Sequence, residues 1–387
     1  MMKTSRGPIV VFGILFGYPL AGVTYQFLHY LLALRRLGWD PYYIEERWAL
    51  YDPEHNDITP DARRNIARVA PVLAAYGFGD RWAYRSHHEN GHIYGIGETR
   101  LSAVYREAAA LLNVTGTQEL REEHLVCPRR IYVESDPAEV QIKHAEGDAK
   151  TLRMLRLHDT LFSFGENLGQ PDCGVPIAHL TWLPTRQPVA LDLWHSEGAG
   201  GQAYTTIATW HNRKDVVYRG ETYYWSKDRE FEKVLDLPRR RSVPFELATR
   251  ADAATATRLT EHGWRLRDPF AVSGDVERYR AFIEASRGEF TVAKDQYVRL
   301  RTGWFSDRSA CYLAAGRPVI TQDTGFGNVL PTGKGLFAFR DLDGALAALD
   351  AIESDYEGHC RAARELAVEY FDAERVVGSL LERSGLG

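Results

Sequence analysis

The chain has 387 residues and a formal net charge of −5, and 44% of its residues are hydrophobic while 26% are charged. This length exceeds what one ordinary hydrophobic core accommodates, so the sequence predicts two domains. The composition is that of a soluble globular protein. The negative net charge argues against general nucleic-acid binding, which depends on a basic surface.

An apolar run near the N-terminus, residues 8–23, has to be assigned either to a signal peptide or to a buried strand. The run is too short to span a membrane, and Gly13, Gly17 and Pro19 interrupt it. We therefore predict that residues 9–16 form the first strand of a parallel sheet and that the chain has no transmembrane segment.

The cysteine and histidine patterns argue against a metal site. The four cysteines form no CxxC pair, so we expect neither disulfides nor a zinc site, and a cytoplasmic location. Three neighbouring histidines lack the carboxylate or cysteine pattern that would complete a metal site, so no metal is predicted. These residues are Cys127, Cys173, Cys311 and Cys360, and His87, His88 and His92.

The beginning of the chain predicts a βαβ unit. Residues 23–37 carry an apolar stripe at helical spacing, and Gly38 ends the predicted helix. A strand over residues 41–45 completes the unit, which requires a parallel sheet and a right-handed crossover. Residues 60–126 are predicted to be mostly helical, with a Gly- and His-rich interruption at residues 86–98.

Two carboxylates follow later strands of this half. The strands predicted at residues 130–134 and 160–164 lead to Asp136 and Glu166. Because the carboxyl ends of parallel strands border the ligand crevice of α/β proteins, both side chains are candidates for acid–base chemistry. A helix cap or a loop turn is the alternative for each of them. Two lone histidines are weaker candidates, His29 and His158.

The second half begins where the composition changes, at residues 196–202 (SEGAGGQ), which form the best linker of the chain. Strands are predicted at residues 204–209 and 288–293. Residues 302–331 then predict a loop, an apolar helix, a buried strand and a second glycine loop. Residues 343–384 are predicted to be helical.

The helix within residues 302–331 begins with side chains that suit a diphosphate: Ser306, Arg308 and Ser309. Main-chain N–H groups and the dipole at such a helix start add a favourable charge, about 0.3–1 kcal/mol in exposed sites. An ordinary helix N-cap is the alternative. Further candidates for the same ligand are Thr324, Gly325, Lys294, Trp210, Asn212 and Lys227.

Three segments of this half resemble the nucleotide-binding domain of GT-B glycosyltransferases. Residues 314–320 (AAGRPVI) are similar to a helix exit of that family, and residues 324–327 (TGFG) lie where it has its next glycine loop. Residues 341–371 look like its terminal helices. The helix start at Arg308 also resembles the spore-coat-maturation type of bacterial glycosyltransferase-like protein. The whole chain is similar to such proteins from secondary-metabolite and polysaccharide clusters.

The resemblance implies two facing Rossmann-like domains with parallel sheets. Residues 1–196 would bind the acceptor, residues 203–370 would bind a nucleotide-diphosphate sugar, and residues 371–387 would pack back on the first domain. It implies metal-independent transfer of the sugar to a small-molecule (natural-product) or glycan acceptor, with no cofactor besides the nucleotide sugar as co-substrate. Asp136 or Glu166 would act as the base of an inverting reaction.

One departure from the family concerns stereochemistry. Retaining members often carry two glutamates eight positions apart before the helix exit, where this chain has Gly303 and Cys311. Two other functions stay open: a nucleotide-sugar epimerase on the same fold, which needs no acceptor, and a non-catalytic protein that binds nucleotide sugars. We also expect Arg308→Ala to weaken nucleotide binding with little effect on folding.

Overall fold

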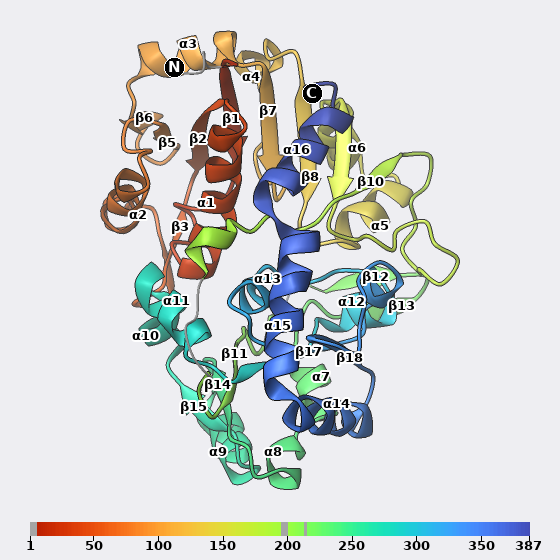
Figure 1. Ribbon diagram of the computed structural model, residues 1–387. Coiled ribbons are helices and arrows are strands. Elements are labelled where there is room, and N and C mark those ends of the chain that lie inside the picture. The colour runs from red at the N-terminus through yellow and green to blue at the C-terminus, as the bar shows by residue number, and fades with distance from the viewer. Residues whose placement is uncertain (1–5, 195–199, 213–214) are drawn as a thin grey trace.

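The computed structural model describes residues 6–194, 200–212 and 215–387. It consists of two α/β domains, one above the other in Figure 1, each built on a largely parallel sheet with helices on both faces. The predicted fold class is therefore confirmed. Of the predicted linker at residues 196–202, residues 196–199 lie outside the described residues.

The N-terminal domain contains an eight-stranded sheet in the order β10-β9-β8-β7-β1-β2-β5-β6, in which only the β5–β6 pair is antiparallel. The chain adds strands on one side of β1 and then on the other, so the order reverses between β1 and β7. The strands are β1 (Pro8–Phe12), β2 (Asp40–Arg47), β5 (Trp82–Ser86), β6 (His92–Gly95), β7 (Ala110–Val114), β8 (Arg130–Glu134), β9 (Thr160–Ser163) and β10 (Trp182–Pro184).

Two layers of helices cover this sheet, which explains why its central strands are apolar on both faces. One layer consists of α1 (Ala21–Arg36), α2 (Arg63–Ala75) and the C-terminal α16 (Ala373–Arg383). The other consists of α3 (Glu98–Glu107), α4 (Glu122–Leu125), α5 (Glu139–Ala145) and α6 (Ala149–Arg156). A small hairpin, β3 (Leu50–Asp52) and β4 (Asp57–Thr59), follows β2.

The C-terminal domain contains a six-stranded parallel sheet in the order β15-β14-β11-β16-β17-β18. Its order reverses between β11 and β16, and ligands of doubly wound sheets bind beyond the carboxyl ends of the strands at such a point. The strands are β11 (Tyr204–Ile207), β14 (Phe245–Ala248), β15 (Arg265–Arg267), β16 (Gly288–Thr291), β17 (Val319–Gln322) and β18 (Leu336–Phe339).

Helices also cover both faces of the second sheet. One face packs against α11 (Val276–Glu284), α13 (Asp307–Ala314) and α15 (Tyr356–Leu366). The other packs against α7 (Asp228–Glu232), α8 (Leu237–Arg240), α9 (Ala253–Glu261) and α14 (Leu342–Ser354). Shorter elements are α10 (Pro269–Ser273), α12 (Asp295–Arg299), the hairpin β12 (Val216–Tyr218) and β13 (Glu221–Tyr223), 3-10 turns at Leu191–Leu193 and Phe326–Asn328, and a π-helical turn at Ala367–Phe371.

One sequence-based expectation is wrong. Residues 60–126 are not mostly helical, because they contain β5, β6 and β7. The Gly- and His-rich interruption is the turn of the β5–β6 hairpin and its second strand. The apolar run of β7 is fully buried, and periodicity alone does not separate such a short run from a buried helix segment.

The two domains meet along several surfaces. Helix α16 leaves the lower domain of Figure 1 and packs beside α1 in the upper one. Helix α1 also contacts the second domain, where the Tyr25 hydroxyl donates to the Val276 carbonyl at 3.2 Å. Within the described ranges, no helix combines the length and apolar character needed to cross a membrane.

Candidate functional site

The carboxyl ends of the two sheets face each other at the domain interface. Lys294, just beyond β16, places its Nζ 2.7 Å from Oδ1 of Asp136, which lies just beyond β8. The Trp304 indole N–H donates to the Ser135 carbonyl at 2.9 Å. The edge at which doubly wound sheets bind ligands is therefore shared by both domains.

Arg308 lies at the reversal point of the second sheet. Its Nε is 2.5 Å from Oε1 of the buried Glu289, and its Nη2 donates to the Thr291 hydroxyl at 3.1 Å. Its Nη1 donates to the carbonyl of Ile207. Since Ile207 ends β11 and Thr291 ends β16, the guanidinium bridges the two strands between which the order reverses.

The buried Arg308–Glu289 ion pair contradicts the expectation that Arg308→Ala has little effect on folding. Arg308→Ala would leave Glu289 buried without its counter-charge, and removal of one member of a buried pair typically destabilises a fold by about 3–5 kcal/mol. The substitution is therefore not a neutral probe of ligand binding.

Lys227 places a second cation at this point. Its side chain is buried, with only 7% of the residue exposed, and its Nζ lies 3.5 Å from the Thr291 hydroxyl. Burial lowers the pKa of Lys227 well below its ordinary value, and the charges of Arg308 and Lys294 lower it further. A buried lysine under these conditions gains much from an anionic partner.

Lys294 is the third cation of the group. Besides Asp136, it contacts the Tyr297 hydroxyl at 3.1 Å, and its Nζ lies 3.5 Å from the centre of the Trp225 ring. The Tyr297 hydroxyl also donates to Asp136. Lys227, Lys294 and Arg308 thus gather near the ends of β11 and β16, and charge-assisted hydrogen bonds from such groups to phosphate oxygens are stronger than those between neutral groups.

The other predicted residues of this helix and loop are buried or contact neighbouring parts of the protein. Ser306 is the N-cap of α13 without a side-chain cap bond, and Ser309 is fully buried. The Thr324 hydroxyl donates to the Trp304 carbonyl at 2.6 Å. At Gly325, with φ +92°, a Cβ would lie 2.9 Å from the Asn167 amide nitrogen, so a loop of the first domain covers this position.

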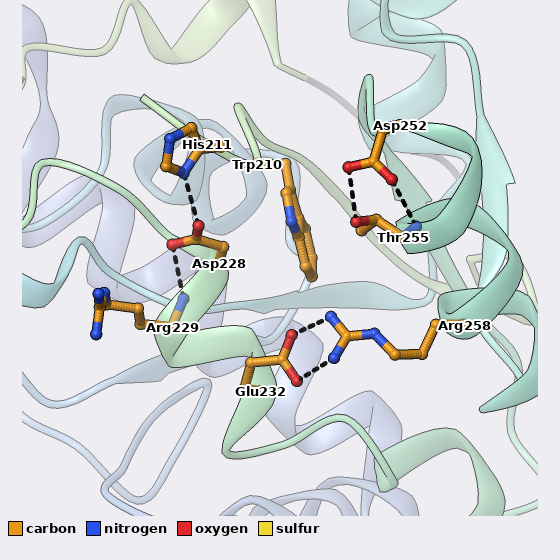
Figure 2. A pocket seen from close by; sticks show the side chains of 8 residues that line it. All are labelled: Trp210, His211, Asp228, Arg229, Glu232, Asp252, Thr255 and Arg258. Atoms are coloured by element: carbon orange, nitrogen blue, oxygen red, sulfur yellow. Dashed lines mark hydrogen bonds and ion pairs between the residues drawn. The ribbon is translucent and has the colours of Figure 1, made fainter. Parts of the chain in front are cut away.

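A cavity of about 350 Å³ lies beside Lys227, between α7 and the start of α9. Trp210 lies at its wall with its ring stacked on Phe231, and the Trp210 carbonyl accepts from the Lys227 N–H. Asn212 lies on the same loop and donates its N–H to the Ser226 hydroxyl at 3.4 Å. Figure 2 shows the cavity lining: Trp210, His211, Asp228, Arg229, Glu232, Asp252, Thr255 and Arg258.

The two predicted carboxylates lie in different surroundings. Asp136 reaches the cation group, whereas Glu166 forms a buried ion pair with Arg186 at 2.5 Å, and burial raises its pKa. The two histidine candidates are buried. His29 accepts from the Trp194 indole, and burial lowers its pKa to about 3, while burial lowers the pKa of His158 to about 4.

Two further carboxylates near Asp136 were missed by sequence reasoning. Asp307, the first residue of α13, has its pKa raised to about 7, mainly by burial and further by the charge of Asp136. Burial also raises the pKa of Glu134, the last residue of β8, to about 8. An acidic residue at the end of a buried strand, as at Glu134, was the available signal.

One buried cluster has the spacing of a metal site. Ligand atoms of Glu46, Glu123 and His124 lie within 4.8 Å of one another. The cluster already holds cations, because Arg121 lies 2.5 Å from both glutamates. Nδ1 of His124 accepts from the Arg121 N–H, so its proton is on Nε2, which faces the carboxylates. These residues therefore form an ion-pair network that suits a metal poorly.

The positions of the family's glutamate pair are closed to such side chains. Gly303 has φ +79°, and a Cβ there would lie 2.3 Å from the Asn167 nitrogen. Cys311 is buried within α13, and burial raises the pKa of its thiol well above the ordinary value.

The structure has the GT-B fold. This fold consists of two doubly wound domains whose carboxyl edges face each other, and a C-terminal helix returns to the first domain. Several solved structures share it. An alpha-glucosyltransferase (AGT) in complex with UDP superposes with a TM-score of 0.59 at 10% identity, covering 98% of this chain and 100% of that chain. Anabaena HepE in complex with UDP and glucose gives 0.56 at 10% identity, covering 98% and 99%. AviGT4, a glycosyltransferase involved in avilamycin A biosynthesis, gives 0.53 at 9% identity, covering 98% and 97%. No protein-family model and no curated protein matches the sequence.

Proposed function

We propose that this protein is a glycosyltransferase that moves a sugar from a nucleotide-diphosphate donor to an acceptor hydroxyl. The observation that carries the proposal is the group of Lys227, Lys294 and Arg308 at the reversal point of the second sheet, with Asp136 of the first domain opposite. The structures with the same fold that were solved with UDP support it.

In this proposal residues 203–370 bind the donor and residues 1–196 bind the acceptor. The diphosphate lies against Lys227, Lys294 and Arg308, and the nucleoside occupies the cavity beside Trp210. The three cations stabilise the charge that develops on the leaving diphosphate, which is the part that a metal ion supplies in other enzymes. The reaction is therefore proposed to be metal-independent.

Asp136 is proposed to take the proton of the acceptor hydroxyl. The acceptor oxygen then forms a bond to the anomeric carbon of the sugar, while the bond from that carbon to the phosphate oxygen breaks. The electron pair of the broken bond leaves with the nucleoside diphosphate. Attack from the face opposite the leaving group inverts the anomeric centre, which agrees with the glutamate pair being replaced by Gly303 and Cys311.

The free cysteines support the proposed cytoplasmic location. The proposed acceptor is a small molecule (a natural product) or a glycan.

The test is a thermal-shift panel of UDP, GDP, ADP and dTDP, followed by incubation with the matching nucleotide sugars. We expect one nucleotide to raise the unfolding temperature and its sugar conjugate to be consumed with an acceptor. Incubation with the donor alone separates transfer from epimerisation, because an epimerase would form an isomer without any acceptor. Lack of stabilisation by any of the nucleotides would contradict the proposal.

A further inference from the structure

An exposed aromatic surface lies on the first domain at the edge that carries Asp136. Trp48, just beyond β2, is 71% exposed, and its ring lies 5.5 Å from that of His87 at an interplanar angle of 34°. Tyr18, beyond β1, is 41% exposed and lies 5.8 Å from Tyr51. We call these four side chains the aromatic platform. With 71% of the residue exposed, the ring of Trp48 is open to a ligand, and single exposed apolar side chains of this kind are common on protein surfaces.

Trp48 and Asp136 follow two strands, β2 and β8, that are aligned by strand register. One aligned row crosses β2, β1, β7 and β8 and consists of Ile44, Phe12, Asn113 and Tyr132. Trp48 and Asp136 each follow their member of this row by four residues. Three strand spacings separate β2 from β8, so the ends of these two strands lie about 14 Å apart along the edge. This distance exceeds the width of one sugar ring.

Contacts with β2 and with the buried Glu46 hold His87 of the platform in place. The His87 N–H donates to the Arg47 carbonyl at 2.9 Å, and His87 Nε2 lies 3.6 Å from the buried carboxylate of Glu46. Arg121 lies 2.5 Å from the same carboxylate and remains partly exposed. A flat apolar ring face thus lies next to a rim of hydrogen-bonding groups.

This combination favours a saccharide over the other possible ligands. A pyranose has an apolar face that stacks on an indole ring and hydroxyls at its circumference that need polar partners. A planar aromatic acceptor would use the ring of Trp48 but has few hydroxyls for the polar groups beside it, Arg121 and His87, which already pair with Glu46. A protein partner would need an interface of several hundred Å² on each side, whereas the platform has one strongly exposed large side chain.

From this we infer that the acceptor is a saccharide of at least two rings, and that a ring remote from the reacting hydroxyl stacks on Trp48. The inference rests on the proposed function, because it assigns one end of the acceptor to the hydroxyl next to Asp136. Contacts with a remote ring contribute binding energy that positions the reacting hydroxyl.

The test compares matched mono-, di- and trisaccharides on a glycan array, in the presence of UDP, followed by transfer kinetics with the saccharides that bind. We expect Trp48→Ala to raise KM for the longer acceptors roughly three- to tenfold, as expected for the loss of one ring-stacking contact. KM for monosaccharides and the Kd for the nucleotide should not change. Trp48→Phe should retain most of the binding, and Val217→Ala, which shortens an exposed apolar side chain of the second domain, should change nothing.

Three results would overturn the inference: no saccharide binds, planar aromatic acceptors are preferred, or Trp48→Ala affects short and long acceptors equally. Each is distinguishable from failure of the proposed function, in which the wild-type protein would not bind any nucleotide.

Discussion

Asp136→Asn is predicted to tighten nucleotide binding while it strongly slows transfer. In the structure Asp136 holds Lys294 at 2.7 Å and accepts from the Tyr297 hydroxyl. A donor diphosphate that binds Lys294 has to displace this carboxylate. Asparagine keeps the shape and the hydrogen bond from Tyr297 but removes the charge that competes with the phosphate.

The size of the effect follows from the surroundings of the pair. The Lys294 side chain is 17% exposed and that of Asp136 is 46% exposed, so solvent screens the attraction strongly. Pairs of this kind contribute about 1 kcal/mol at most. The dissociation constant of the nucleotide should therefore fall about threefold to fivefold. Transfer should fall by about 10²- to 10⁴-fold, as expected for the loss of a general base.

Isothermal titration of nucleotide into the wild-type and variant proteins measures the first effect, and product formation measures the second. The gain in affinity should shrink at high salt, because partly exposed charges are screened. Glu139→Gln is the matched control, since it removes a charge from α5 that pairs with Lys143. Weaker or equal binding by Asp136→Asn, or the same gain in Glu139→Gln, would refute the reasoning.

Two further predictions concern stability. Burial raises the pKa of Glu134 from 4.5 to about 8, so between these values the folded state holds a proton that the unfolded state has lost, and stability falls as the pH rises. Glu134→Gln should remove this dependence and gain about 4 kcal/mol near pH 8, as measured by urea unfolding, since one pKa unit corresponds to about 1.4 kcal/mol; an unchanged pH profile would contradict it. Gly303→Ala should lower the unfolding temperature more than Gly220→Ala, because both glycines have positive φ (+79° and +80°) but only at Gly303 does a Cβ meet a neighbour, the Asn167 nitrogen at 2.3 Å. Equal shifts in a thermal melt would show that the contact with Asn167 is unimportant.

The sequence predicts the architecture of the fold well, because apolar strands and helical stripes are local signals. It fails at β7, where a short apolar run has no distinguishing period. The helix start at Arg308 was recognised from sequence, but its buried partner Glu289 was not, since the pairing depends on how α13 packs against β16.

In the candidate site, too, the sequence identifies single residues but not their contacts in three dimensions. Lys227, Lys294 and Arg308 were each named from sequence, but only the three-dimensional arrangement brings Lys227 and Arg308 to the Thr291 hydroxyl, with Lys294 close enough to affect the pKa of Lys227. The loop at Thr324 and Gly325 carries a family motif, yet it contacts the first domain. Such a contact between domains leaves no trace in local sequence.

The central claim, that the three cations form a diphosphate site, is tested most directly by Lys227→Met. Methionine fills the same volume without a buried charge, so the free variant should unfold at a higher temperature than the wild-type protein. The same variant should lose most of the thermal shift that the best nucleotide produces in the wild-type protein. A variant that is less stable, yet binds the nucleotide as well as the wild-type protein does, would contradict the claim.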